Sequence, residues 1–358
     1  MKYLLSLLLL LSINSFGQTI THRMLLFGDA GEINEGQQLS IKTALGLVIP
    51  EKTSVYFLGD NIYPVGMGID SASALETEQI LRHQYAPFIY INVPVTFIAG
   101  NHDWDKSGKQ GLEKVKAQEA YLFSRSLDLL KFVPKAGTAD VSVVDITNTT
   151  KAILYDSEYW LFPHHSNPDS ALSEQVRNIF LDNIKSLISS NPDQTIFILS
   201  HHPMLSYGEH GKNITWKDHV FPLTRKWKNL YVPLPIIGSV YPLLRNTIFH
   251  SAEDMGHTIY QKLINDITNS TSNHKNILFI AGHDHGLQFI ENQNITQIVT
   301  GSGSKTSHIA HNTAQKFVSN KQGFCVLDVL SSEDIRLAFY TVEKGTVTKS
   351  FETLLPKK

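Results

Sequence analysis

From Met24 onward the sequence alternates short apolar runs with longer amphipathic stretches. Five of the runs end in polar side chains: MLLFGD, SVYFLGD, VPVTFIAGN, TIFILSHH and NILFIAGHDH. They are too short for helices and are typical of strands buried on both faces. Between them, apolar residues recur near every third or fourth position, which predicts helices over residues 36–48, 72–85, 111–130 and 172–189. This β-α-β-α order predicts an α/β fold.

The pattern changes after Gly286. The runs LQFIE, TQIVT, GFCVLDVL and IRLAFYTVE are separated by short turns with no room for helices, so we expect a second, more antiparallel sheet. No repeat, low-complexity linker or charge run divides the chain, which favours a single domain over residues 18–358. An apolar segment with three prolines, KWKNLYVPLPIIGSVYPLLRN, cannot form one continuous helix. We interpret residues 226–256 as an insertion, either packed on the surface or forming a rim over a site.

The first 17 residues resemble an export signal. Lys2 is followed by an apolar run from Tyr3 to Leu11 and by small residues. This run is about half the length that a transmembrane helix needs, roughly 20 residues, so we expect no transmembrane anchor. Cys325 is the only cysteine, and no internal disulfide can form. The combination predicts a secreted or periplasmic protein of a bacterial envelope.

Charge and composition exclude one class of partner. Lys and Arg number 31 against 33 for Asp and Glu, with 42% hydrophobic and 18% charged residues. This is the balance of a globular protein with a large core, and it offers no basic field for nucleic acid. We therefore expect a small substrate and no nucleic acid; the sequence does not identify any partner proteins.

Side chains that can bind metal ions follow each of the five strand-like runs. They are Asp29, Asp60, Asn101, His201, and the pair His283 and His285. Ligands of α/β sheets bind outside the carboxyl ends of the strands, so these side chains are expected to converge. Taken singly, each has a simpler explanation as a turn, a helix cap or a hydrogen-bonded histidine. Glycine precedes four of the six, at Gly28, Gly59, Gly100 and Gly282, which indicates close backbone approach.

The number and kind of donors favour two ions. With Tyr63 in GDNIY the set holds seven oxygen and nitrogen donors, and a carboxylate such as Asp60 can bridge two metals. The mixture of oxygen and imidazole ligands favours iron, zinc or manganese over calcium or magnesium.

The motifs GDAG, GDNIY, GNHD, SHHP, GEHGK and GHDHGLQF resemble those of the calcineurin-like metallophosphoesterases. They are more similar to the small purple acid phosphatases of the tartrate-resistant type. The resemblance spans about Met24 to Ser304. It implies a four-layer α/β/β/α sandwich, with two packed mixed sheets flanked by helices, and a metal-dependent phosphoric monoester hydrolase.

The resemblance also assigns the ligands. The first ion, an iron, would take Asp29, Asp60, Tyr63 and His285. The second ion, iron, zinc or manganese, would take Asp60, Asn101, His201 and His283. Many relatives carry a histidine two residues after the first aspartate, where this chain has Gly31. Tyr63 can replace that donor as a phenolate, because Fe(III) can lower a phenol pKa of about 10 below neutrality.

The expected reaction is direct, in-line attack on the phosphorus by a metal-bound hydroxide, since no nucleophilic Ser or Cys motif accompanies the ligands. His102 and His210 are candidates to protonate the leaving group. Asp103 could orient His102, and His202 is either structural or a phosphate contact.

Two other functions stay open. One is a phosphodiesterase or nucleotide pyrophosphatase of the same fold, since the metals do not select the leaving group. The other is a non-enzymatic, metal-holding binding protein of the envelope. The sequence does not specify the substrate, the metal pair, the pH optimum or the oligomeric state.

Overall fold

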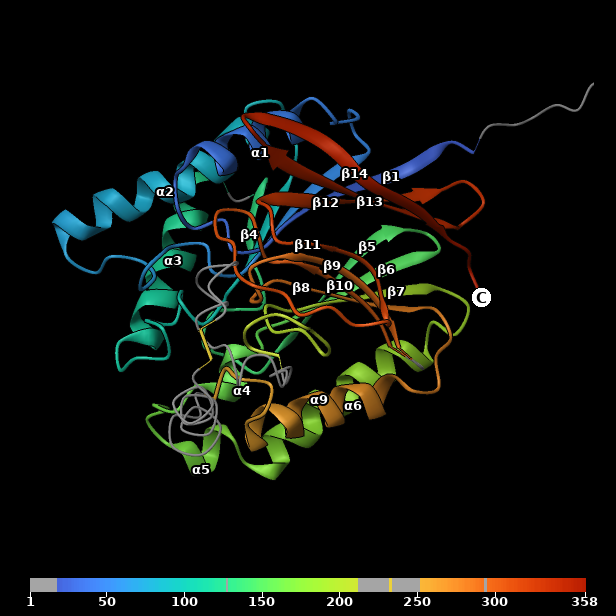
Figure 1. Cartoon of the computed structure of the whole chain (residues 1–358). Coiled ribbons are helices and arrows are strands. Elements are labelled where there is room, and N and C mark those ends of the chain that lie inside the picture. The colour runs from blue at the N-terminus through green and yellow to red at the C-terminus, as the bar shows by residue number, and fades with distance from the viewer. Residues whose placement is uncertain (1–17, 127, 212–231, 234–251, 293–294) are drawn as a thin grey trace, which may run out of the picture.

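The structure is a computed structural model that describes residues 18–126, 128–211, 232–233, 252–292 and 295–358. The predicted signal peptide and nearly all of the predicted insertion lie outside these residues. Two seven-stranded sheets form the centre of the molecule (Figure 1). None of the helices in the described part of the chain combines the length and apolar character needed to cross a bilayer.

The first sheet has the order β14-β13-β12-β1-β2-β3-β4. Four parallel strands come from the N-terminal part of the chain: β1 (Ile20–Phe27), β2 (Thr53–Leu58), β3 (Val95–Ile98) and β4 (Leu130–Phe132). Three antiparallel strands complete it: β12 (Gly323–Leu330), β13 (Ile335–Glu343) and β14 (Thr346–Leu355).

The second sheet has the order β11-β9-β10-β8-β7-β6-β5. Its parallel strands are β6 (Thr150–Tyr155), β7 (Thr195–Leu199), β8 (Ile277–Ala281) and β10 (Ile295–Thr300). The strands β5 (Val141–Thr147), β9 (Leu287–Asn292) and β11 (Gln315–Ser319) pair antiparallel with their neighbours.

The C-terminal strands do not form a sheet of their own, so that prediction is wrong. β9, β10 and β11 join the second sheet, whereas β12, β13 and β14 join the first. Every residue of β12 is buried, which suits a strand between two others with both of its faces covered. That position exists beside β1, because β2 occupies only the other side of β1.

Alternate residues of each central strand face two different cores. On β1, Met24 and Leu26 pack between the sheets, whereas Leu25 and Phe27 pack toward the helices. Helices α1 (Glu35–Leu45), α2 (Ser71–Ile89) and α3 (Gly111–Arg125) lie on the first sheet, and α6 (Glu174–Ser189) and α9 (Thr258–Thr271) lie on the second (Figure 1). Short helices α4 (Glu158–Leu161) and α5 (Pro168–Ala171) precede α6. The four-layer α/β/β/α arrangement is confirmed.

Local side chains set the helix boundaries. α2 begins at Ser71 because the Asp70 carboxylate accepts hydrogen bonds from the amides of Ala72 and Ser73. α6 begins after Ser173, whose hydroxyl accepts from the Val176 amide. α3 ends earlier than predicted, at Arg125, because the chain must enter β4 at the edge of the first sheet.

The two sheets meet closely where the parallel strands end. The Gly28 amide, just after β1, donates to the Thr300 carbonyl at the end of β10 (2.9 Å). A Cβ on Gly28 would lie 2.8 Å from the Cα of Gly282, closer than real Cβ contacts. This junction brings the residues that follow β1 and β2 next to those that follow β7 and β8.

Candidate metal centre

Three of the predicted ligands have strained backbones. Asp29, Asp60 and His283 adopt φ values of 57°, 53° and 69°, in the left-handed region that residues other than glycine seldom occupy. Such strain persists where surrounding structure enforces it, and it concentrates at functional sites. Here it turns each side chain from the end of its strand toward the junction of the sheets.

Three predicted donors gather around the hydroxyl of a fourth, Tyr63. It lies 3.0 Å from Asp29 Oδ1, 3.1 Å from Asp60 Oδ2 and 3.2 Å from His285 Nε2. One ligand atom each from Asp29, Asp60 and His285 lies within 4.8 Å of the others, a spacing that can hold a metal ion. This is the set predicted for the first ion.

A second group forms around His201. Its Nε2 atom lies 3.0 Å from Asn101 Oδ1 and 3.3 Å from Asp60 Oδ1. Its Nδ1 atom lies 2.8 Å from the Leu58 carbonyl oxygen, so Nδ1 carries the hydrogen and Nε2 is available for a metal. Asp60 therefore directs one carboxylate oxygen toward each group.

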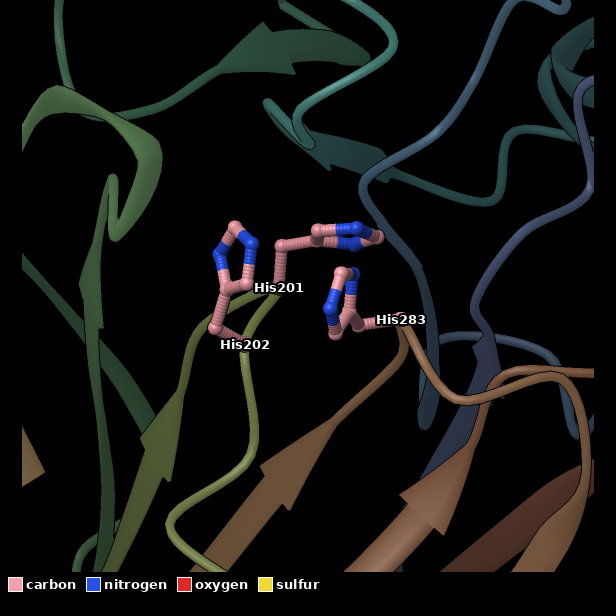
Figure 2. Close-up of side chains that lie close together, drawn as sticks. All are labelled: His201, His202 and His283. Carbon is pink, nitrogen blue, oxygen red and sulfur yellow. The ribbon is translucent and has the colours of Figure 1, made fainter. Parts of the chain in front are cut away.

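His283 joins the second group from β8. Its ring centroid is 5.2 Å from that of His201, and Figure 2 shows the two rings side by side with His202. His283 Nε2 lies 3.0 Å from the Glu253 carbonyl oxygen, which leaves Nδ1 free to coordinate. Sequence reasoning missed Glu253, since a backbone carbonyl has no sequence signature; it belongs to the described end of the region interpreted as an insertion.

The electrostatics of the cluster fit cations. Burial raises the pKa of Asp60. The charges of His201 and His102 lower this pKa by a larger amount, so the net shift is downward. Burial lowers the pKa of His201, but Asp60 and Asp29 raise it more. Burial and both carboxylates raise the pKa of Tyr63 well above its usual value. A phenolate at Tyr63 therefore requires a strongly charged cation among the same oxygens.

The predicted close approach at Gly100 is confirmed. A Cβ there would lie 2.3 Å from the Asp60 amide nitrogen and 2.4 Å from Asp60 Oδ1. No side chain can occupy that space without displacing Asp60. Gly100 thus lets the loops after β2 and β3 touch, which places Asn101 beside His201.

Asp103 does not orient His102, and that prediction is wrong. Its buried carboxylate accepts hydrogen bonds from the Gly100 amide (2.8 Å), the Asn61 side chain (2.9 Å) and the Asn61 amide (3.1 Å). His102 Nδ1 instead lies 2.5 Å from the Pro64 carbonyl oxygen. Asp103 therefore holds together the loops that carry Asp60 and Asn101. Its carboxylate lies in the interior because the N–H donors of Gly100 and Asn61 are there.

Replacing Asp103 with alanine is expected to lower the free energy of unfolding by about 3 kcal/mol, because buried N–H groups of two loops lose their acceptor. The loosened loops should also weaken metal retention. Urea unfolding followed by fluorescence measures the first effect, and metal analysis after dialysis measures the second. An unchanged unfolding midpoint would contradict the clamp.

His102 and His210 both border the cluster and are partly exposed. His102 packs edge-on against the Tyr63 ring, and its Nε2 is 3.9 Å from Asp60 Oδ2. The His210 ring lies 4.2 Å from that of His283, and its Nδ1 is 3.1 Å from Asp254 Oδ1. Burial lowers the pKa of His210, but Asp254 raises it through this hydrogen bond, and the net shift is upward.

His202 is completely buried, which favours the structural interpretation over a phosphate contact. Its Nδ1 lies 2.8 Å from the Ser157 hydroxyl, and its ring is 4.3 Å from that of His283. His201, His202 and His283 together have a spacing that can hold a metal ion (Figure 2). From the sequence, His202 was expected to be structural or a phosphate contact, and its place beside two ligand imidazoles was not predicted.

Comparison with known proteins identifies the family. The calcineurin-like phosphoesterase family matches residues 22–226, more than half of the chain. Glideosome-associated protein 50 of Plasmodium falciparum (isolate 3D7) is 34% identical over 83 residues, which are 23% of this chain and only 21% of that protein.

Three solved structures share the fold. GAP50, described as the anchor in the inner membrane complex of Plasmodium, has a TM-score of 0.58 and 17% identity, covering 95% of this chain and 90% of GAP50. Purple acid phosphatase PPD1 from yellow lupin (Lupinus luteus) seeds has a TM-score of 0.56 and 14% identity, covering 94% of this chain and 53% of PPD1. PhoD has a TM-score of 0.56 and 11% identity, covering 95% of this chain and 70% of PhoD.

Proposed function

The chain belongs to the calcineurin-like phosphoesterase family, and on that premise we propose that it hydrolyses phosphate monoesters with a dinuclear metal centre. One observation carries the proposal: the Asp60 carboxylate reaches Tyr63 with Oδ2 and His201 with Oδ1, as a residue shared by two ions would. When bound, two ions supply an activated water and neutralise charge on the phosphate oxygens. The test is hydrolysis of p-nitrophenyl phosphate with and without a chelator.

The roles of the chain's own residues follow from their places. Asp29, Asp60, Tyr63 and His285 would hold one ion, and Asp60, Asn101, His201 and His283 the other. His210 would donate a proton to the leaving alkoxide, because the Asp254 carboxylate favours its protonated form. His102, at the rim beside Tyr63, would contact a phosphate oxygen.

The metal identities are part of the proposal. Tyr63 favours Fe(III) at the first position, and the second would take iron, zinc or manganese. Tyr63→Phe is expected to abolish the visible iron–phenolate absorption of iron-loaded protein while the fold is retained. Tyr90→Phe, at an exposed tyrosine, is the matched control. A wild-type protein that is active but colourless when loaded with iron would remove the iron–phenolate assignment and leave the phosphatase proposal in place.

The fold neighbours favour a second candidate. GAP50 is described as an anchor, so a non-catalytic, metal-holding protein of the envelope is the alternative to an enzyme. Within the enzymes, a phosphodiesterase or nucleotide pyrophosphatase is the other option. p-Nitrophenyl phosphate and bis-p-nitrophenyl phosphate separate the three: the first substrate identifies a monoesterase, the second a diesterase, and loaded protein that cleaves neither supports the binding protein.

We also propose export to the periplasm or cell exterior and a small phosphorylated substrate. The apolar run after Lys2 supports the first. Cell fractionation of a tagged chain tests it, with a Leu8→Arg variant as comparison. Equal cytoplasmic retention of both proteins would contradict export.

A further inference from the structure

Two unpartnered polar atoms face each other behind the second metal position. His202 and Glu158 are both 0% exposed. His202 Nδ1 is engaged by Ser157, but His202 Nε2 has no hydrogen-bond partner within the described part of the chain, and neither has Glu158 Oε2. The two atoms are 3.8 Å apart.

That distance suits a shared cation better than a hydrogen bond. Hydrogen bonds between nitrogen and oxygen span about 2.7–3.2 Å, and a buried polar atom left unpaired destabilises the folded state. A zinc-like ion lies about 2.0–2.2 Å from each ligand, so it can join atoms up to about 4.2 Å apart. We propose that His202 Nε2 and Glu158 Oε2 bind a third cation, separate from the dinuclear centre.

A second carboxyl group lies within reach of this site. The Ser107 hydroxyl is 2.7 Å from Glu158 Oε1 and 2.8 Å from Glu253 Oε1. The Ser107 hydroxyl thus links the two carboxyl groups, and it can donate its single hydrogen to only one of them at a time. The loop enforces this arrangement: Asp105, Lys106 and Ser107 all adopt left-handed φ angles, which are held only under structural constraint.

The donor chemistry indicates the class of cation. One imidazole with carboxylate oxygens suits zinc, manganese or ferrous iron better than calcium. Coordination through Nε2 uses the tautomer in which His202 Nδ1 carries the hydrogen and donates it to the Ser157 hydroxyl oxygen. Burial and Glu253 raise the pKa of Glu158, so binding should release a proton.

This site is additional to the seven predicted ligands, which include neither His202 nor Glu158. The His202 ring is 4.3 Å from that of His283, so this site would hold a cation next to the second ion. Calling it the third site rests on the proposed dinuclear centre. A bridging water or proton is the competing occupant.

The test is the summed iron and zinc content of the full chain after loading with both metals and desalting. Wild type is expected to hold three ions, and both Glu158→Gln and His202→Asn are expected to hold two. These changes preserve the hydrogen bonds to Ser107 and Ser157. Ser107→Ala, which removes no ligand atom, should keep three ions.

Two ions in active wild type, or three ions in both ligand variants, would overturn the third site and leave the phosphatase intact. A wild type that binds no ion would overturn both proposals. Where a variant fails to fold, anomalous scattering from zinc-loaded wild-type crystals decides. A peak between His202 Nε2 and Glu158 Oε2 supports the site, and its absence overturns it.

Discussion

Asp60→Asn is expected to reduce kcat/KM for p-nitrophenyl phosphate by about 10³-fold or more and to release metal from the protein. Asp60 is buried, and each of its carboxylate oxygens faces a different group of ligands. A neutral amide of the same shape loses the anionic charge and one of the two oxygen donors. Metal ions stabilise such transition states by several kcal/mol, and each 1.36 kcal/mol is tenfold in rate.

The matched control is Asp70→Asn. Asp70 caps α2 on the surface, and asparagine caps helices about as well, so activity and metal content should not change. Metal analysis and steady-state kinetics on both variants make the comparison. Asp60→Asn protein that keeps its ions and more than a tenth of wild-type activity would contradict a bridging role.

His210→Ala is expected to slow hydrolysis of an alkyl phosphate, such as glycerol phosphate, by about 10²–10⁴-fold. The loss should be much smaller for p-nitrophenyl phosphate, because p-nitrophenolate leaves without protonation. The sign of the pH effect follows from the same contacts. Burial lowers the pKa of His210 but Asp254 raises it more, so the donor stays protonated above its ordinary range. The alkyl phosphate rate should fall as pH rises through that raised pKa, and Asp254→Asn should move the fall to lower pH.

His83→Ala, at an exposed position of α2, is the control for this substitution. His102→Ala is the informative comparison, since His102 is the other histidine at the rim. Equal slowing of both substrates by His210→Ala would remove the proton-donor assignment. A leaving-group-dependent loss in His102→Ala alone would transfer the role to His102.

Much of this site could be predicted from the sequence, for a simple geometric reason. Parallel strands end at one edge of a sheet, so polar residues that follow buried runs must meet there. Asp29, Asp60 and His201 were located by that rule alone. The glycines that precede the ligands also predicted close backbone contacts, and a Cβ on Gly100 would indeed collide with Asp60.

The remainder depends on contacts between distant segments. The sequence of β12, GFCVLDVL, does not specify pairing with β1 over pairing with β9, because an apolar strand would be buried in either position. Asp103 is adjacent to His102 in sequence, yet the amides of Gly100 and Asn61 determine where its carboxylate lies. The Glu253 carbonyl that orients His283 could be found only by folding the chain.

The most direct test is a crystal structure of the metal-loaded protein with anomalous scattering data. Apart from the separate cation at His202 and Glu158, we predict two ions about 3.5–4 Å apart, with one Asp60 oxygen on each, Tyr63 on the first and His201 on the second. A single ion, or two ions that Asp60 does not join, would contradict the proposed centre.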